Sequence, residues 1–325
     1  MRVAIDLMIA EKEPGGMLFA TRALLDGLAQ TNEGFEYVII TSHPQAYQTL
    51  VKVPHIRLYP VELRSWRGLT LQHQLLMPAL LRHIRPDVLH VPAFVAPLRW
   101  HGPLVMTVHD LAFLTMPQQA SLYARLYWQY ALRASVQQAR HIIAVSAQTR
   151  LELLSTWSIA TEKVSVIHNA LRSSLSHASM TSTEAQKLRQ RYGNRYLLHV
   201  GRIMPRKNVG IVVEAFNTLA AQFPDLQLIL TGGAGHGSET VLLQIKQSPY
   251  HERIHLVGWV AEQELATLYT GASALVFPSH HEGFGLPTIE AMACGTPVIA
   301  CSTAASQEIA GNARVGFCYL SRHLV

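Results

Sequence analysis

Short apolar runs alternate with longer segments of helical periodicity along most of the chain. In the first half, VAIDL (3–7) and EYVIIT (36–41) have the pattern of strands, and MLFATRALLDGLAQ (17–30) has apolar residues at helical spacing. Such alternation indicates a parallel, doubly wound sheet with helices between its strands. Further strands are predicted at 87–91, 103–110, 141–146 and 164–169, further helices at 71–84, 119–139 and 147–157, and an apolar run at 55–61.

The pattern is interrupted once and then resumes. Residues 172–194 are rich in Ser and Thr at their start and contain no strand-like run, so we interpret them as a linker followed by an entry helix. We therefore expect an α/β protein of two tandem Rossmann-like domains, 1–171 and 195–325, facing a cleft that holds the ligand at the carboxyl ends of the strands. The second domain has predicted strands at 196–201, 226–233, 253–259, 273–279 and 297–300, and helices at 209–223, 239–247, 262–272 and 287–294.

Composition narrows the class of protein. A length of 325 residues suits two domains, and 27 Lys and Arg against 21 Asp and Glu give a net charge of +6 that is spread without runs. We therefore expect an enzyme and no nucleic-acid partner. Three cysteines, Asp6 inside the apolar start, and the lack of a long apolar stretch predict a cytoplasmic protein without signal peptide or membrane span.

In SHHEGFGLPTIEAMACGTPVI (279–299), a glycine-rich turn connects a predicted strand to a short predicted helix. Pro287 suits the first position of a helix over 287–294. Free N–H groups and the helix dipole form an anion site at such a helix start, and Gly283 and Gly285, which lack a Cβ, let backbone approach a ligand closely. The pattern predicts a bound phosphate there.

Two glutamates lie on either side of this turn. Carboxylates repel phosphate but accept hydrogen bonds from hydroxyls, so Glu282 and Glu290 would hold sugar hydroxyls on either side of a diphosphate. A ligand with hydroxyls, diphosphate and hydroxyls again is a nucleotide sugar. The alternative is that Glu282 is a solvated loop residue and that Glu290 caps or solubilises the helix.

The stretch EGFGLPTIEAMACGTPVIA resembles the Glu-x7-Glu region of retaining glycosyltransferases of the GT-B fold, most closely glycosyltransferase family 4. The resemblance implies that Glu282 contacts the donor sugar and Glu290 the ribose. It also implies that backbone around Phe284, Gly285 and Leu286 meets the diphosphate and sugar.

Further positions support the same chemistry. In VGRIMPRKNVGIVVEAF (200–216), Arg202 and Lys207 follow a strand and can neutralise a departing nucleoside diphosphate without a metal, although a basic surface loop would have the same pattern. The resemblance assigns them to the diphosphate clamp and places His109, in TVHDLAFL (107–114), near the reacting carbon. Without the resemblance, a lone histidine at a strand end is more often a packed or hydrogen-bonded residue with no part in the reaction.

The resemblance also implies donor contacts outside the motif. It implies that the loop with Gly15 and Gly16 faces the donor phosphates, although a plain turn explains that pair equally well, and that the nucleobase lies at LVGWV (256–260), where Gly258 stands.

Several other activities are excluded because their sequence motifs are missing or lie in an unsuitable structural context. HERIH (251–255) satisfies the zinc pattern H-E-x-x-H, but it runs into a strand, where residues four apart lie about 13 Å from each other, too far to share one zinc. The chain has no G-x-G-x-x-G, no P-loop and no Asp-x-Asp pair, since its aspartates are 6, 26, 87, 110 and 225. We therefore expect neither a cofactor nor a metal.

The predicted activity is transfer of a hexose, mannose or glucose, from a nucleotide sugar to a glycan or lipid-linked acceptor with retention, in the synthesis of cell-surface polysaccharide. The alternatives are a non-catalytic or impaired nucleotide-sugar binder and a nucleotide-sugar epimerase. Helix 71–85 and the basic, aromatic stretch RSWRGL (64–69) leave open a contact with the inner face of the membrane, although a solvated face is favoured.

The end of the chain departs from the family pattern. Family members continue past QEIAGNAR for some 50 residues of helices, whereas this chain ends in VGFCYLSRHLV. We therefore expect a last strand near 315–319 without its covering helix, and impaired activity or stability.

Overall fold

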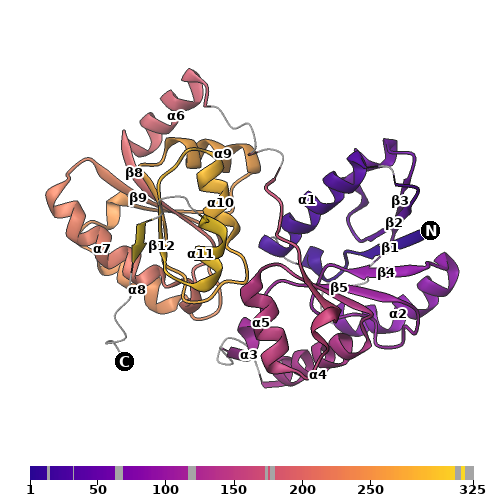
Figure 1. Cartoon of the computed structure of the whole chain (residues 1–325). Coiled ribbons are helices and arrows are strands. Elements are labelled where there is room, and N and C mark those ends of the chain that lie inside the picture. Colours follow the sequence, from indigo (N-terminus) through magenta and orange to yellow (C-terminus); the bar gives the residue numbers. More distant parts are fainter. Residues whose placement is uncertain are drawn as a thin grey trace. The chain divides into compact units, whose positions relative to one another are not determined.

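A computed structural model of the chain describes residues 1–12, 15–31, 33–62, 69–115, 122–172, 175, 180–311 and 316–318. The chain divides into two compact units, Met1–Ala170 and Leu171–Val325, each built around its own sheet (Figure 1). The division falls one residue before the predicted end of the first domain at 171.

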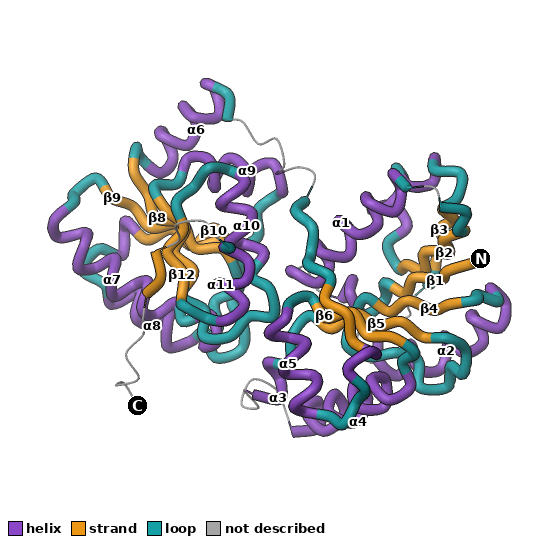
Figure 2. Tube along the Cα trace, viewed as in Figure 1, coloured by secondary structure: helices purple, strands orange, loops and turns teal. Residues whose placement is uncertain are grey.

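The first unit is a seven-stranded parallel sheet covered by helices. Its strands are β1 (Arg2–Asp6), β2 (Glu36–Thr41), β3 (Ile56–Pro60), β4 (Val88–Val91), β5 (Leu104–Val108), β6 (His141–Ala144) and β7 (Val164–Val166). Its helices are α1 (Gly16–Gln30), α2 (Leu69–Ile84), α3 (Ala112–Thr115), α4 (Leu122–Gln138) and α5 (Ala147–Thr156). The strand order is β3-β2-β1-β4-β5-β6-β7, with α1 on one face of the sheet and α2 and α4 on the other (Figures 1 and 2).

The second unit repeats this plan. Its strands are β8 (Arg195–Val200), β9 (Leu226–Thr231), β10 (Ile254–Gly258), β11 (Ala274–Phe277), β12 (Val298–Cys301) and β13 (Gly316–Cys318). Its helices are α6 (Ser182–Tyr192), α7 (Val209–Gln222), α8 (Glu239–Gln247), α9 (Glu262–Gly271), α10 (Leu286–Ala293) and α11 (Ala304–Ala310). All neighbouring strands pair in parallel in the order β10-β9-β8-β11-β12-β13. The expected tandem Rossmann-like architecture and the predicted last strand are confirmed.

Each sheet has one point at which its strand order reverses. In the first unit the chain leaves β1 toward β2 and later returns to place β4 on the other side of β1. In the second unit β8 and β11 are neighbours in the same way. Right-handed crossovers in opposite directions place the connecting helices on opposite faces, which opens a crevice at the carboxyl ends of these two strands.

Local sequence explains the elements around these points. Strand β9 is apolar at nearly every position, with a single half-buried glutamine, because helices cover both faces of a parallel sheet. Helix α6 begins with a capping box in which Thr181 accepts from the Glu184 N–H and the Glu184 carboxylate accepts from the Thr181 N–H. It ends at Gly193, whose φ of +79° is easily adopted only by glycine.

Some boundaries differ from the sequence predictions. Strand β5 ends at Val108, so His109 and Asp110 lie just beyond it, and α10 begins at Leu286, which makes Pro287 the second helical residue and not the first. Helices α3 and α11 were not predicted. Parts of the predicted linker (173–174 and 176–179), the predicted helix start at 119–121 and the C-terminal residues 319–325 lie outside the described residues.

The hypothesis of a membrane contact remains a prediction. Within the described residues, no helix combines the length and the apolar character needed to cross a bilayer. Leu71 and Leu75 on α2 are 65% and 62% exposed, whereas RSWRGL lies outside the described residues except for Leu69.

The core of the second unit predicts a contrast between two helical leucines. Leu268 on α9 is fully buried, and Leu268→Ala is expected to lower the free energy of unfolding by about 2–5 kcal/mol through lost contacts and the remaining cavity. Leu243→Ala, at a position on α8 that is 53% exposed, should change it by only about 0.5 kcal/mol. Urea titration followed by circular dichroism measures both, and equal effects would contradict this packing.

Candidate functional site

The loops that follow β8 and β11 are joined by a cluster of charged side chains at the reversal point of the second sheet. The Nζ of Lys207 lies 2.5 Å from Oε1 of Glu282, and the guanidinium of Arg206 lies 3.1 Å from the same oxygen. Arg206 also donates to the His281 carbonyl at 2.6 Å, and its own carbonyl accepts from the His280 N–H at 3.0 Å. The predicted site residues Glu282 and Lys207 are therefore in direct contact.

The cluster strongly favours the ionised form of Glu282. Burial of this carboxyl group raises its pKa, but the charges of Lys207 and Arg206 and the hydrogen bond from Lys207 outweigh burial and lower the pKa of Glu282 to about 2. The side chains of Arg206, Lys207 and Glu282 are only 12–14% exposed, so little water screens them. A substrate group that replaces Glu282 as the ion-pair partner of Lys207 must carry a comparable negative charge.

Arg202 adds a third cation at the same edge of the sheet. Its guanidinium lies over the ring of Trp259, 5.8 Å from the ring centroid, in the loop after β10. Trp259 is 47% exposed, so its ring is open to solvent beside the guanidinium. Among these four described side chains, three cations stand against one carboxylate, a balance that suits an anionic ligand.

Glycines allow the loops after β8, β9 and β10 to pack against one another. A Cβ on Gly232, whose φ is +103°, would lie 2.4 Å from the Gly201 carbonyl oxygen, so no other residue fits without displacing backbone. The Gly232 N–H donates to the carbonyl of Gly258, a predicted donor-binding residue, at 2.6 Å. Gly258 itself has open space around its Cβ position.

The start of α10 provides fewer amides than the sequence pattern predicts. Gly285 caps this helix with a φ of +91°, Pro287 has no N–H, and the Thr288 N–H donates to the Gly285 carbonyl at 2.9 Å. A small cavity, with room for about one water molecule, lies here against Glu282 and the buried Phe284. Thr288 lines this cavity, and its buried hydroxyl has no hydrogen-bond partner among the described residues. Of the other predicted residues, Gly283 and Leu286 are also buried.

Glu290 differs from Glu282 because its carboxylate is fully buried among protein donors. Arg172 donates to its Oε1 from two nitrogens, at 2.7 and 2.8 Å, and the Tyr269 hydroxyl donates to its Oε2 at 2.8 Å. Burial raises the pKa of Tyr269 well above its ordinary value, and the charge of Glu290 adds to this. A ribose hydroxyl that binds Glu290, as predicted, must share these oxygens or displace one donor.

The remaining predicted residues belong to the first unit. Gly15 and Gly16 lie after β1 at the start of α1, and His109 directly follows β5. Burial lowers the pKa of His109, although Asp110 and a hydrogen bond to the Pro92 carbonyl oppose the shift. Among the described residues the buried imidazole Nε2 has no hydrogen-bond partner, which leaves Nδ1 as the nitrogen available to the Pro92 carbonyl. A neutral imidazole held in this way presents Nε2 as an acceptor.

The described residues contain no group of three or more His, Cys, Asp or Glu side chains that could hold a metal ion. In the HERIH segment, His251–Arg253 form a 3₁₀ turn and β10 begins at Ile254, so its two histidines do not share a helical face. His251 contacts the Ser248 carbonyl and His255 contacts Gln227.

Several residues of the site were not found from the sequence. Arg206 was noted only as an extra charge, and Arg172, Tyr269 and Thr288 were not singled out at all. His199 was also missed: it is buried behind Lys207, and burial, with a smaller effect from the charge of Lys207, lowers its pKa to about 4, which keeps it neutral. Only Arg206 had a sequence signal, its place beside Lys207.

Two family models match nearly the whole chain. The model described as Glycosyltransferase Family 4 matches residues 14–174, and the one described as Glycosyl transferases group 1 matches residues 180–322. The O-antigen chain mannosyltransferase B of Escherichia coli is 28% identical over 265 residues, which cover 79% of this chain and 67% of that protein. The O-antigen chain mannosyltransferase RfbU of Salmonella typhimurium is 28% identical over 207 residues, covering 64% of this chain and 54% of that protein. This chain thus spans between half and two thirds of their lengths.

Solved structures share the fold. The crystal structure of Anabaena Alr3699/HepE in complex with UDP-glucose superimposes with a TM-score of 0.71 at 23% identity. The match covers 95% of this chain and 82% of that one. At this identity the similarity establishes the architecture, two Rossmann-like sheets in tandem.

The lowered pKa of Glu282 predicts a pH-dependent contribution to stability. Because the pKa falls from 4.5 in the unfolded chain to about 2 in the folded one, the contribution is complete above pH 4.5 and is lost as the pH falls toward 2. The difference in free energy of unfolding between the wild type and Glu282→Gln should therefore shrink by about 2 kcal/mol between pH 6 and pH 3. Urea titrations at both pH values measure it, and a difference independent of pH would show that the ion pairs do not form.

Proposed function

From the premise that this chain belongs to the glycosyltransferases of the GT-B fold, we propose that it transfers a hexose from a nucleotide diphosphate sugar to a glycan or lipid-linked acceptor. Transfer proceeds with retention at the anomeric carbon and without a metal ion. The product belongs to cell-surface polysaccharide synthesis, and the reaction takes place in the cytoplasm or at the inner face of the membrane.

The observation that carries this proposal is the contact of Lys207 and Arg206 with Glu282 at the reversal point of the second sheet. It combines what a nucleotide sugar requires, cations for the diphosphate and an acceptor for sugar hydroxyls, within one set of hydrogen-bonded loops. Ligands of doubly wound sheets bind at this point.

Each part of the cluster has a role in the proposed reaction. Negative charge builds on the leaving diphosphate in the transition state, and Arg202, Lys207 and the start of α10 stabilise it. Release of Lys207 toward the diphosphate leaves Glu282 free to accept from the sugar hydroxyls. The departing phosphate oxygen takes the proton of the acceptor hydroxyl, and His109 lies beside the reacting carbon. Gly258 lies at the nucleobase, while Gly15 and Gly16 approach the phosphates.

The names of similar proteins support the choice of sugar. The two similar bacterial proteins are O-antigen mannosyltransferases, which favours mannose and a glycan acceptor. The Anabaena structure was solved with UDP-glucose, which favours a nucleotide diphosphate donor and keeps glucose as the second candidate.

A donor screen tests the function. Isothermal titration with UDP-glucose and GDP-mannose should show binding of one of them, and a product assay with lipid-linked glycan should show transfer of its sugar. Binding without transfer would favour a nucleotide-sugar binder. Conversion of the donor in the absence of acceptor, followed by NMR, would favour an epimerase.

The proposed clamp predicts the effect of removing Lys207. Lys207→Ala should lower turnover by about 100-fold or more, the scale of losing one contact to developing charge. Lys246→Ala, which removes a lysine from the last turn of α8, is the matched control and should keep turnover within about threefold. Steady-state kinetics with the donor found in the screen measures both variants. Lys207→Ala turning over within threefold of the wild type would refute the clamp.

A further inference from the structure

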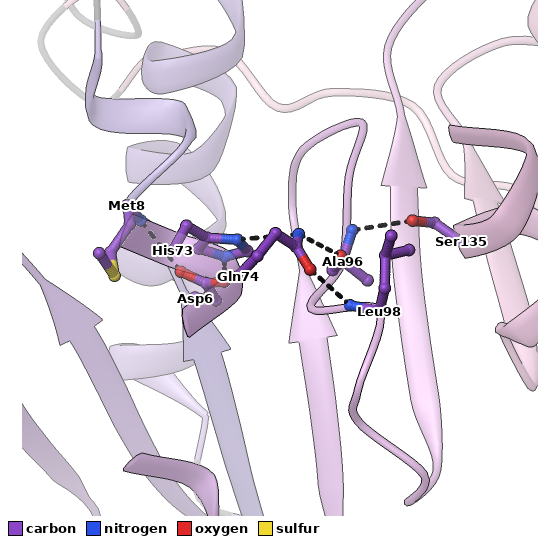
Figure 3. A network of polar contacts seen from close by, with 7 residues as sticks. All are labelled: Asp6, Met8, His73, Gln74, Ala96, Leu98 and Ser135. Carbon is purple, nitrogen blue, oxygen red and sulfur yellow. Dashed lines mark hydrogen bonds and ion pairs between the residues drawn. The ribbon is translucent and has the colours of Figure 1, made fainter. Parts of the chain in front are cut away.

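A polar network crosses the first unit from β1 to α4 (Figure 3). Asp6, at the end of β1, accepts from the Met8 N–H at 3.1 Å and from Nε2 of His73 on α2 at 2.6 Å. The side chains of Asp6 and His73 are completely buried. The next residue, Gln74, continues the network into the connection between β4 and β5 (Figure 3).

Gln74 bonds two backbone groups of this connection. Its Nε2 donates to the Ala96 carbonyl at 3.0 Å, and its Oε1 accepts from the Leu98 N–H at 2.8 Å. From the opposite side, the Oγ of Ser135 on α4 accepts from the Ala96 N–H at 3.0 Å (Figure 3). Side chains from two helices therefore satisfy three backbone groups of a buried loop, which restricts its conformation.

The orientation of the Gln74 amide is fixed by these partners. Reversing it would place its NH₂ against the Leu98 N–H and its oxygen against the Ala96 carbonyl. In the observed orientation Nε2 also lies 3.4 Å from Nδ1 of His73, a long contact that suits a lone pair on Nδ1. His73 then donates from Nε2 to Asp6, so every member of the network has a compatible role.

Two residues of the same loop, Pro92 and Phe94, interact with His109. The Pro92 carbonyl accepts from His109, and the Phe94 ring lies edge-on to the imidazole, with centroids 6.4 Å apart and planes at 76°. These two contacts set the tautomer and tilt of the ring, whose Nε2 has no hydrogen-bond partner in the part of the chain that the structure describes. Any shift of residues 92–98 therefore moves the acceptor nitrogen of His109.

We propose that Gln74 is a positioning residue for His109: by bridging Ala96 and Leu98 it fixes the 92–98 loop, and through Pro92 and Phe94 it fixes the imidazole. The catalytic meaning of this rests on the function proposed above, whereas the structural link from Gln74 to His109 does not. The hydrogen bonds of Gln74 within the described residues go to His73, Ala96 and Leu98 and not to His109, so its effect on His109 passes through the 92–98 loop.

Histidine-selective ¹⁵N NMR tests the link directly. The signals of His109, identified by their loss in His109→Gln, should report one neutral tautomer protonated at Nδ1 in the wild type. Gln74→Met keeps the side-chain length but removes both bonds, and it should shift these signals. Ser135→Ala removes the bond to Ala96, together with a bond from the Ser135 hydroxyl to the Ala131 carbonyl within α4. It should shift the His109 signals less, so it serves if Gln74→Met fails to fold.

Gln138→Met is the matched control. Gln138 on α4 also donates to a backbone carbonyl of the connection between β4 and β5, that of Trp100, which lies outside the 92–98 loop. This variant should leave the His109 signals unchanged. Unchanged His109 signals in both Gln74→Met and Ser135→Ala, with the chains folded, would overturn the proposal.

Kinetics separates this proposal from the proposed function. With UDP-glucose or GDP-mannose as donor, release of nucleoside diphosphate by Gln74→Met should fall about tenfold or more in kcat, with KM within about threefold, because a small misplacement of a reacting group lowers turnover more than binding. Shifted His109 signals with undiminished turnover in both Gln74→Met and His109→Gln would support the positioning link and refute a catalytic role of His109.

Discussion

One carboxylate, that of Glu282, joins the loops that follow β8 and β11 in the second unit. Without it, Lys207 and Arg206 would be two nearly buried cations side by side, which is costly for a folded chain. With it, the loops after β8 and β11 are tied together, and the two cations are held in fixed positions beside one carboxylate. The ion pairs therefore stabilise the folded loops, and an anionic substrate would compete with Glu282 for the two cations.

The two glutamates of the motif lie in different environments and have different structural roles. Glu282 is partly accessible and accepts from Lys207 and Arg206, two long cationic side chains, so it can exchange partners. The carboxylate of Glu290 is buried and bonded to both Arg172 and Tyr269. Arg172 is the second residue of the second unit, directly after Leu171. Glu290 therefore also anchors the segment that leads from one unit into the next, a role separate from any contact with a ribose.

Sequence patterns predicted most of the architecture because parallel strands buried on both faces are almost continuously apolar. β2 and α8 were located to the residue, and the site residues Glu282 and Lys207 were predicted and found in contact. α11 was missed because its capping box pairs Thr303 with Ser306, whereas the usual partner is glutamate or glutamine. The partners of Glu290 could not be predicted. Arg172 lies 118 positions away in the sequence, and no local sequence pattern indicates which distant side chain will contact a buried carboxylate. The roles of the site residues toward a donor remain predictions.

The contact at Gly232 limits how this protein can be altered. A Cβ at position 232 would lie 2.4 Å from the Gly201 oxygen. In a library that randomises the loops after β8 and β9, most variants with a side chain at 232 would therefore misfold, whatever sugar they were designed to accept. Gly258 has open space at its Cβ position, although its φ of +66° favours glycine or asparagine. Attempts to redirect donor choice should therefore keep 232 constant, try asparagine at 258, and place their diversity at Trp259.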